Sequence, residues 1–287
     1  MSGDTICVSV DVEDWVQSTF DIESDISDRV RVNTLQMLDL VDELSIVATW
    51  FVQGMVAEAF PELVGEILSR GHEVGCHAHT HRPLWKMGAK ELREDIQTAR
   101  KTIEDAGGRA LSGFRAPDFS VCPPTRSLDQ VDRSVFQELA EQGFEYDSSV
   151  VPARTRRYGI SSAPRGPFML REGLIEIPTG SVRLGRMFPA LGGGYLRVFP
   201  QAYQRLSIAQ SKAGQYPPVV YLHPYELDPR ELSELNQTRS IPLKTRVLQG
   251  LGRGRVRERL TQVTRGLRSV TMQALCAGLR REDLVTV

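Results

Sequence analysis

The segment Ile46–Val52, with the sequence IVATWFV, is a nearly continuous apolar run near the start of this 287-residue chain. A short apolar run without polar alternation is typical of a strand that is buried on both faces, as the strands of parallel sheets are. A helical repeat of apolar residues precedes it between Leu35 and Leu44. A second helical pattern follows it, beginning at Pro61 and ending at Gly71. Helix and strand therefore alternate around this segment, which predicts βα units.

The same alternation continues along the first half of the chain and returns near residue 220. Repeated βα units imply a parallel sheet, arranged either as a barrel or as an open doubly wound sheet. In both arrangements, functional sites lie at the carboxyl ends of the strands. The other strands that we expect are Ile6–Val10, Glu73–Cys76, Ala110–Phe114, Phe144–Tyr146 and Val219–Leu222.

The composition is that of an ordinary globular protein, with 41% hydrophobic and 25% charged residues. The formal net charge of −1 gives no reason to expect a nucleic acid partner. The N-terminus has no basic region followed by a long apolar run, and no stretch approaches the ~18–20 apolar residues that cross a bilayer. Because the four cysteines include no Cys-x-x-Cys pair, we expect a reducing, cytoplasmic location.

Two segments depart from the βα pattern within what we expect to be a single domain over residues 1–287. Residues 151–200 are rich in Arg, Pro and Gly, and we interpret them as a long, semi-regular insertion. Residues 239–268 hold nine Lys or Arg and the single acid Glu258, which predicts a basic, helical arm. Such a run is most often a solvated helix face. The alternative is contact with an anionic lipid-linked glycan or, peripherally, with the inner membrane's cytoplasmic leaflet.

Three of the five histidines stand close together, as His77, His79 and His81 in the segment Gly75–Pro83. His77 and His81 are four residues apart, so on one turn of helix their rings would face the same side. Two imidazoles at this spacing can bind one divalent metal ion. We expect His79 to be a neighbour of this pair rather than a ligand.

Carboxylates and a further histidine stand at the ends of the first and last of these predicted strands. The acidic cluster Asp11-Val12-Glu13-Asp14 ends the first strand, and an isolated Leu222-His223-Pro224 ends the last. A carboxylate early in the chain, paired histidines in the middle and a lone histidine late suggest a metal-assisted hydrolase.

Taken together, these motifs resemble those of the polysaccharide deacetylase family, the NodB-homology or carbohydrate esterase 4 group. The resemblance covers about residues 5–225 and is closest to a subgroup that accompanies bacterial exopolysaccharide and O-antigen gene sets. It implies a distorted (β/α)7–8 barrel and an enzyme that removes the acetyl group from an N-acetylated amino sugar during polysaccharide biosynthesis. The motifs that carry it are Ser9-Val10-Asp11-Val12-Glu13-Asp14, His77 to His81, Arg115-Ala116-Pro117 and Leu222-His223.

The resemblance also implies a role for each motif residue. Asp11 is expected to be the general base and His223 the general acid, with Arg115 orienting Asp11 by a charge-assisted hydrogen bond. His77 and His81 are expected to bind a divalent metal ion; Zn²⁺ is the first choice, and Co²⁺, Ni²⁺ and Fe²⁺ are alternatives. The substrate is expected to be an N-acetylated saccharide or a lipid- or nucleotide-linked glycan.

The third metal ligand is left open between Glu13 and Asp14. Period-two alternation puts Glu13 on the same face of the strand as Asp11. A bulge at the strand end would instead present Asp14. We favour Asp14 slightly, because its shorter side chain matches the aspartate that is usual in the family.

Four further residues are candidates for contact with the substrate. The backbone N–H near Asp118 is expected to stabilise the oxyanion of the reaction. Trp15 and Tyr195 are expected to stack on sugar faces, although aromatic residues in such places as often serve packing. Asp147 either tunes a catalytic group or caps the turn at Ser148-Ser149.

Two other functions fit parts of the sequence. In the first alternative, the chain is a catalytically silent relative that binds a sugar. In the second, it is a deacetylase-like barrel that acts on a small non-sugar amide. The first is disfavoured because the base, the ligands, the arginine and the acid are all retained. The second is disfavoured because the arginine-rich segment and the basic arm favour a large anionic ligand.

Overall fold

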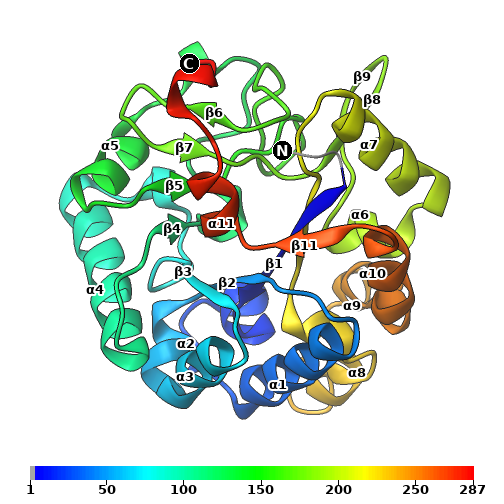
Figure 1. Ribbon diagram of the computed structural model, residues 1–287. Helices are drawn as coiled ribbons and strands as arrows, with labels where there is room; N and C mark the ends of the chain where they lie inside the picture. Colours follow the sequence, from blue (N-terminus) through cyan, green and yellow to red (C-terminus); the bar gives the residue numbers. More distant parts are fainter. Residues whose placement is uncertain (1–3) are drawn as a thin grey trace.

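The computed structural model describes residues 4–287 and is a curled sheet surrounded by helices (Figure 1). The sheet has the order β10-β1-β2-β3-β4-β5-β7-β6, and β11 pairs with β1 beside that path. Every pairing from β10 to β7 is parallel, and β6 pairs antiparallel with β7. The strands are β1 (Thr5–Val12), β2 (Thr49–Val52), β3 (Glu73–Cys76), β4 (Gly113–Phe114), β5 (Tyr146–Asp147), β6 (Phe168–Met169), β7 (Ile175–Glu176), β10 (Val219–Leu222) and β11 (Arg268–Val270), and a separate hairpin holds β8 (Ser181–Leu184) and β9 (Arg186–Pro189).

Irregular backbone joins the two ends of the sheet. After β7, the Thr179 N–H donates to the Val150 carbonyl at 3.1 Å, and the Gly180 N–H donates to the Val219 carbonyl at 3.0 Å. The chain thus passes from the β5 side to β10 without forming a regular strand. The expected distorted (β/α) barrel is confirmed, and its distortion lies at this connection.

The helices lie on the outside of the sheet, as the βα pattern predicts (Figure 1). No helix within residues 4–287 is long and apolar enough to cross a membrane. The α-helices are α1 (Asp28–Glu43), α2 (Gly54–Ala59), α3 (Pro61–Ser69), α4 (Ala89–Gly107), α5 (Ser134–Glu141), α6 (Gly193–Val198), α7 (Gln201–Ala213), α8 (Glu231–Leu235), α9 (Leu243–Gly250), α10 (Val256–Thr264) and α11 (Met272–Ala277).

Strand β1 is buried along its whole length, and its side chains alternate between two environments. Its even-numbered residues, from Ile6 to Val12, belong to the main apolar cluster, which they share with the surrounding helices. Cys7 belongs to a smaller cluster with Phe51 and Tyr146. Asp11 lies on the same side of the strand as Cys7, so the alternation directs this carboxylate away from the main apolar cluster.

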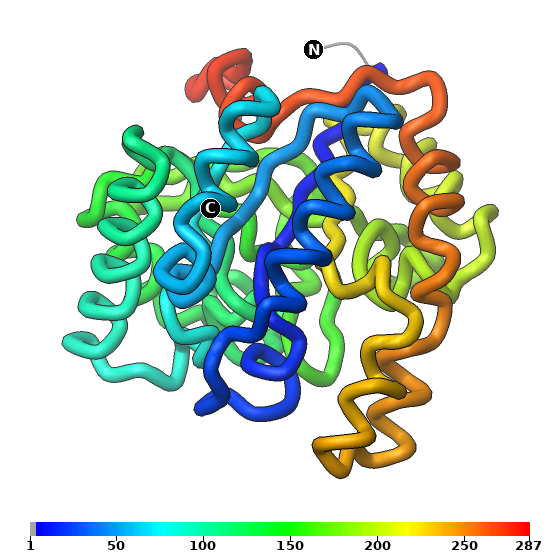
Figure 2. The backbone as a smooth tube through the Cα atoms, turned by 90° about the horizontal axis from the view of Figure 1, so that it is seen from below, coloured from blue at the N-terminus to red at the C-terminus, as the bar shows by residue number. Residues whose placement is uncertain are grey.

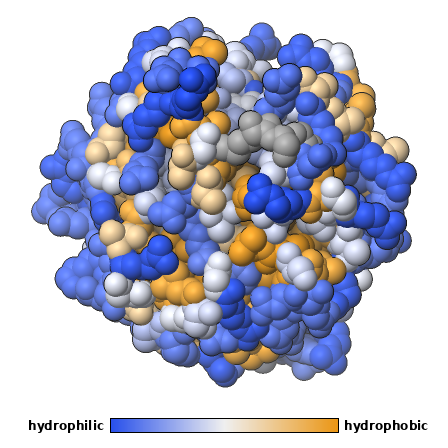
Figure 3. All heavy atoms as spheres, in the orientation of Figure 1, coloured by the Kyte–Doolittle hydropathy of each residue, from blue (hydrophilic) through white to orange (hydrophobic). Residues whose placement is uncertain are grey.

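The face seen in Figure 1 is the amino end of β1, since β11 pairs there with the first residues of that strand. Figure 3 shows that hydrophilic residues form most of the rim of this face, whereas hydrophobic residues gather nearer its centre. Helix α11 lies over the sheet here and buries Met272 and Leu275 against Cys7 and Phe51. The candidate catalytic residues lie at the opposite, carboxyl end.

Residues 151–200 are more closely built into the barrel than an insertion would be. They include β6 and β7, and β7 pairs in parallel with β5 through Ile175 and Glu176. They also include the β8–β9 hairpin and α6. The expectation of a semi-regular insertion is therefore corrected, because part of this segment extends the sheet.

Residues 239–268 form several short elements rather than one helical arm. They comprise α9, a 3-10 turn at Arg253–Arg255, α10 and the first residue of β11. Arg253 is buried, donates to the Tyr225 carbonyl at 2.8 Å and pairs with Glu231 at 2.5 Å, so part of the basic charge serves packing. Figure 2 shows that the segment around α8 and α9 (gold to orange) extends past the rest of the chain.

Candidate active site

Polar side chains from several strand ends meet in one cavity at the carboxyl end of the sheet. The cavity has a volume of about 130 Å³. The ends of β1, β3, β4 and β10 lead into it, as expected for a parallel barrel. Five residues predicted from the sequence line it: Asp11, Glu13, His77, Asp118 and His223.

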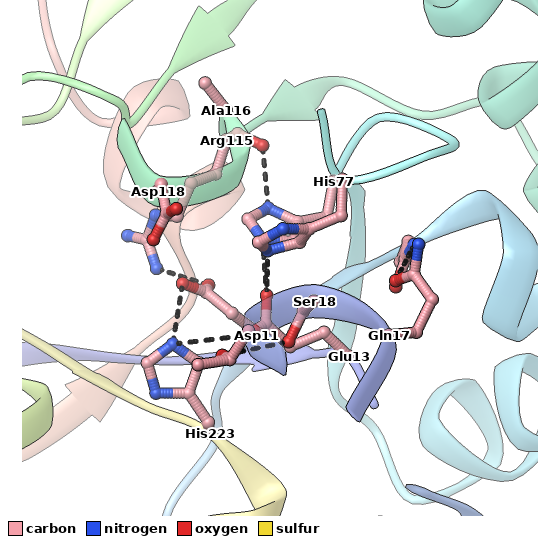
Figure 4. Close-up of polar contacts among 12 residues, drawn as sticks. Asp11, Glu13, Gln17, Ser18, His77, Arg115, Ala116, Asp118 and His223 are labelled. Atoms are coloured by element: carbon pink, nitrogen blue, oxygen red, sulfur yellow. Dashed lines mark hydrogen bonds and ion pairs between the residues drawn. The ribbon is translucent and has the colours of Figure 1, made fainter. Parts of the chain in front are cut away.

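Arg115 holds the Asp11 carboxylate in place. Its Nη1 donates to Asp11 Oδ1 at 2.8 Å and to Ser9 Oγ at 2.7 Å. Its Nε and Nη2 donate to the carbonyl and hydroxyl of Ser148, and its guanidinium lies 4.4 Å from the centre of the Phe51 ring. Arg115 is 0% exposed, so this pair is shielded from water and from salt. Figure 4 shows Asp11 between Arg115 and His223.

Glu13, His77 and His81 form a buried group of three ligand atoms that all lie within 4.8 Å of one another. Glu13 Oε2 is 2.5 Å from His81 Nε2 and 3.3 Å from His77 Nε2. Burial alone would raise the pKa of Glu13. The charge of His81 and hydrogen bonds from both imidazoles outweigh this effect and hold the pKa well below its usual range. The carboxylate therefore stays ionised beside two imidazoles.

This donor set fits a divalent transition metal ion. Two imidazole nitrogens and one carboxylate oxygen are a common three-ligand set for catalytic zinc, which keeps a further position for water. The other ring nitrogen of His77, Nδ1, lies 2.8 Å from the Arg115 carbonyl. A backbone carbonyl accepts from an N–H, so this contact directs the Nε2 lone pair toward Glu13 and His81.

A loop, and not a helical turn, brings His77 and His81 together. The residues after β3 are irregular, and Ala78 and His81 have positive φ angles of 55° and 61°. Asp95 of α4 holds the loop by accepting from the N–H groups of His79 and Thr80, at 2.8 and 3.1 Å. The expected proximity of the two rings is thus found, but the expected helical reason for it was wrong.

Asp14 points away from the two histidines. Its Oδ1 accepts from the N–H groups of Val16 and Gln17 at 2.8 and 3.2 Å, where a short helical segment, η1 (Val16–Phe20), begins. Its Oδ2 accepts from the N–H of Ser27 at 3.1 Å and from the Ser27 hydroxyl. The expectation that Asp14 lies beside the histidines is therefore corrected: Glu13 lies there, because simple alternation continues past the end of β1.

His223 faces the two carboxylates from the end of β10. Its Nε2 lies 4.0 Å from Asp11 Oδ2 and 3.9 Å from Glu13 Oε1, and its Nδ1 lies 3.4 Å from Glu226 Oε1. Burial would lower the pKa of His223. The hydrogen bond to Glu226 and the charges of Glu13, Glu226 and Asp11 act the other way and raise the pKa to about 9. The ring is therefore in its protonated form at neutral pH, as a proton donor must be.

Two residues expected to touch the substrate are buried elsewhere. Trp15 is 1% exposed and packs with Val16 and Tyr225 outside the cavity, so it does not offer a face to a sugar. Asp147 is 0% exposed and accepts from the Ser149 hydroxyl at 2.5 Å. Both expectations of direct substrate contact are corrected, and the alternative of Asp147 as a partner of the Ser148-Ser149 turn agrees with this bond.

The other two residues expected to contact the substrate, Asp118 and Tyr195, lie nearer the cavity. Asp118 lines it from a turn after β4, with a positive φ of 52°, and pairs with Arg157 at 2.6 Å. Tyr195 is partly buried in α6, stacks on Phe199 and hydrogen-bonds Tyr158, which itself lines the cavity. Tyr195 therefore does not line the cavity itself but contacts Tyr158, which does.

The sequence reading missed several residues that shape the site. Glu226 hydrogen-bonds His223 and forms an ion pair with Arg197 at 3.3 Å. Tyr225 stacks on the His223 ring with 4.9 Å between ring centres. The signal for Glu226 was present, since it stands three residues after His223, a spacing at which side chains of a helical turn meet. Arg197 lies far from both in the sequence and had no such signal.

Comparison with known protein families divides the chain into two matched segments, which meet at about residue 146. Residues 11–145 match the family profile described as polysaccharide deacetylase, and residues 148–277 match a domain of unknown function, DUF3473. A solved structure from Mycobacterium smegmatis, described as a candidate polysaccharide deacetylase, has the same fold. It superposes with a TM-score of 0.67 at 20% identity, covering 99% of this chain and 93% of that one.

Curated relatives are similar over less than half of the chain. A peptidoglycan deacetylase of Helicobacter pylori is 31% identical over 42% of this chain and 38% of its own length. A chitooligosaccharide deacetylase of a Bradyrhizobium species is 34% identical over 37% of this chain and 58% of its own length. The similarity thus covers less than two thirds of either relative.

Proposed function

This chain belongs to the polysaccharide deacetylase family, the NodB-homology or carbohydrate esterase 4 group, and we propose that it is a metal-dependent hydrolase that removes the acetyl group from an N-acetylated amino sugar. One observation carries the proposal. The carboxylate of Asp11, the group of Glu13, His77 and His81, and the imidazole of His223 converge on one cavity. The curated relatives include deacetylases of peptidoglycan and of chitooligosaccharides, and this arrangement supplies a base, an acid and a set of metal ligands for such a reaction.

Asp11 is the proposed general base. Arg115 occupies its Oδ1, which leaves Oδ2 directed toward His223 and free to take a proton from the attacking water. The buried ion pair fixes the carboxylate in one orientation, so no reorganisation is needed during the reaction.

His223 is the proposed general acid. When the C–N bond of an amide breaks, the nitrogen would leave as a strongly basic anion unless it receives a proton. A proton donor beside the nitrogen lets it leave as a neutral amine. Nε2 of His223 faces the cavity, and Nδ1 is held by Glu226. The Asp118 backbone N–H is proposed to stabilise the oxyanion.

Glu13, His77 and His81 are the proposed metal ligands, and Zn²⁺ is the proposed ion, with Co²⁺, Ni²⁺ or Fe²⁺ as substitutes. A bound dication supplies Lewis acidity to the amide carbonyl and lowers the pKa of a nearby water to about 7. The chain's own contribution is to hold three ligand atoms within 4.8 Å of one another, next to His223, whose Nε2 lies 3.9 Å from Glu13 Oε1.

The proposed substrate is an N-acetylated sugar of bacterial exopolysaccharide or O-antigen synthesis, carried on a lipid or nucleotide. A cytoplasmic step is supported by the four cysteines, which are all free. We also propose that residues 1–287 act as one domain. The support is that β1, whose last two residues begin the first matched segment, pairs with β10 and β11 of the second.

Peripheral contact with the inner membrane is proposed to occur through α9. Within the described chain, α9 has no buried residue, and Leu243, Val247, Leu248 and Leu251 on or beside it are 51–67% exposed. Lys244 adds an exposed positive charge between them. Apolar residues flanked by cations are typical of helices that lie on an anionic lipid surface.

The proposal is tested by measuring bound metal and acetate release together. The purified chain is assayed with nucleotide-linked, lipid-linked and polymeric N-acetylated sugars, and with small N-acetyl amides. Acetate release from a sugar, lost on chelation and restored by Zn²⁺, supports the proposal. Release from the small amides alone, or sugar binding without any release, contradicts it.

A further inference from the structure

A second cavity, distinct from the one that holds Asp11 and His223, has four arginines among its nine lining residues. Its volume is about 820 Å³. Arg126, Arg154, Arg156 and Arg186 contribute to its wall, together with polar and apolar residues such as Thr155 and Met187. We call these four side chains the arginine cluster. They come from three separate parts of the chain.

No member of the arginine cluster pairs with a carboxylate anywhere in residues 4–287, and all four are exposed. Their neighbours behave differently. Arg157 pairs with Asp118 at 2.6 Å, and Arg133 pairs with Glu172 at 2.5 Å. Four unpaired guanidinium groups around one cavity repel one another, in a chain whose net charge is only −1. An anion bound between them would relieve this repulsion.

A tightly bonded turn connects this cavity to the catalytic one. The Thr155 hydroxyl accepts from the N–H groups of Arg157 and Tyr158, at 3.1 Å each, and donates to the Tyr158 carbonyl at 2.9 Å. Along this turn, Arg154 and Arg156 line the arginine cavity, whereas Arg157 and Tyr158 line the catalytic cavity. The turn is thus a shared wall of both cavities.

Gly159, the residue after this turn, has a backbone conformation that fixes the shape of the turn. Gly159 has a φ of +107°, and a Cβ atom there would lie 1.7 Å from the Ala153 carbonyl oxygen. Only glycine fits at this position. Ala153 and Gly159 therefore bring the two ends of the turn together, which fixes where Arg154 and Arg156 emerge.

The β8–β9 hairpin supplies the other wall. Arg186 lies with its guanidinium 4.7 Å from the centre of the Phe188 ring, so its head group is supported on an aromatic face. Met187, between them, packs against the cluster of Phe119, Val151, Ala153 and Tyr221, and Phe119 and Tyr221 also line the catalytic cavity. Both walls of the arginine cavity are thus continuous with the catalytic site.

We propose that the arginine cluster is a binding subsite for an anionic part of the substrate. The recognised chemistry is that of oxyanions with at least two negative charges, which guanidinium groups bind through paired hydrogen bonds. These oxyanions belong either to the diphosphate of a carrier or to carboxylates on neighbouring sugar units. This inference rests on the proposed deacetylase function for its physiological meaning, but the anion site itself is testable without it.

Direct binding is the first test. Calorimetric titration of the full chain with inorganic pyrophosphate, at low and at high salt, is compared between the wild type, the Arg154→Ala/Arg156→Ala variant and Arg186→Ala. Each arginine lost is expected to weaken binding about tenfold, the scale of one charge-assisted hydrogen bond. Arg183→Ala is the matched control, since Arg183 is an exposed arginine of the same hairpin that does not line the cavity. Equal affinity in all variants, or no binding by the wild type, would overturn the proposal.

Kinetics distinguish the two sources of the anion. Three substrates are compared: a nucleoside-diphosphate-linked N-acetylhexosamine, an N-acetylated oligosaccharide containing uronic acids, and a neutral N-acetylhexosamine oligomer. The Arg154→Ala/Arg156→Ala variant should raise KM at least tenfold for one charged substrate, with kcat unchanged and the neutral substrate unaffected. The substrate whose KM rises identifies the source of the anion.

The two proposals fail in different ways. If pyrophosphate binding depends on the arginine cluster but no sugar releases acetate, the anion site stands and the deacetylase function fails. If acetate is released with the same KM from charged and neutral sugars in wild type and variant, and pyrophosphate does not bind, the anion site fails and the function stands.

Discussion

Asp11 Oδ2 and His223 Nε2 face each other across the catalytic cavity at a distance of 4.0 Å. Neither residue is held by the other. Asp11 is fixed by Arg115 and His223 by Glu226, each through a hydrogen bond on its far side. The proposed base and the proposed acid are therefore each held in position by a different partner.

From this arrangement we predict that Asp11→Asn and His223→Ala each lower turnover by about 10²–10⁴-fold, the usual scale for a general base or acid. Both variants should retain the metal ion, because neither side chain belongs to the group of Glu13, His77 and His81. Acetate release and metal content are measured on the same preparations. Wild-type turnover in either variant would refute the assignment.

The metal ion is predicted to depend on Glu13 and not on Asp14. Glu13→Gln, His77→Ala and His81→Ala should each reduce bound zinc to well below one ion per chain, because a three-ligand site loses a donor or its only negative charge. His79→Ala is the control, since its N–H and not its ring holds the loop. Elemental analysis after dialysis checks this, and full metal content in Glu13→Gln would contradict the assignment.

Asp14→Ala is predicted to reduce stability while leaving metal binding intact. Asp14 accepts from three backbone N–H groups, of Val16, Gln17 and Ser27, which would lose their partner. Loss of a carboxylate that caps backbone N–H groups costs about 1–2 kcal/mol. Urea denaturation of the metal-free protein measures this loss. A stable variant that no longer binds metal would restore Asp14 as the ligand.

A pH dependence of stability is predicted from Asp147 and Glu176, which are buried at paired positions of β5 and β7. Burial raises the pKa of Asp147 to about 6, and burial together with the charge of Asp147 raises the pKa of Glu176 well above its usual value. The folded chain thus keeps protons that the unfolded chain releases at pH 4–5. The free energy of unfolding should therefore fall as the pH rises from about 4 through 6.

Glu176→Gln removes one titrating group while preserving a hydrogen-bond donor to Asp147. The fall in unfolding free energy between pH 4 and 7 should be less steep in this variant than in the wild type, as measured by urea denaturation at a series of pH values. A wild-type slope that is unchanged by Glu176→Gln would show that the pair does not hold the extra proton.

Membrane contact through α9 is predicted to depend on its exposed apolar residues. Leu243→Ser/Leu248→Ser should weaken binding to vesicles containing phosphatidylglycerol about a hundredfold or more, because burial of each leucine contributes about 1.5–3 kcal/mol. Leu184→Ser is the control, as Leu184 is an exposed leucine of the β8–β9 hairpin. Co-sedimentation measures binding, and equal binding by both variants would contradict the proposal.

Much of the barrel could be predicted from local patterns alone. Apolar runs such as Ile46–Val52 marked the parallel strands, although the regular strand is limited to Thr49–Val52. Patterns report the burial of a segment but not where its hydrogen bonding to neighbours ends. The extension of the sheet by β7 was not predicted for the same reason. Strand β7 has only two residues, Ile175 and Glu176, and it is defined by its pairing with β5.

What the sequence determined by itself was the order of chemistry along the chain: a carboxylate after the first strand, histidines after the third, an arginine after the fourth and a histidine after the strand at Val219–Leu222. A parallel barrel brings such residues to one end whatever the details of its loops.

Only the tertiary structure decided which neighbouring side chain points into the cavity. Glu13 faces the histidines and Asp14 does not, because the backbone N–H groups of Val16, Gln17 and Ser27 bind Asp14 on the other side. Alternation along the strand predicted Glu13 and a bulge at the strand end predicted Asp14, and only the backbone N–H groups that bind Asp14 decided between them. The arginine cluster is of the same kind, since its members meet only when residues near 126, 155 and 186 are folded together.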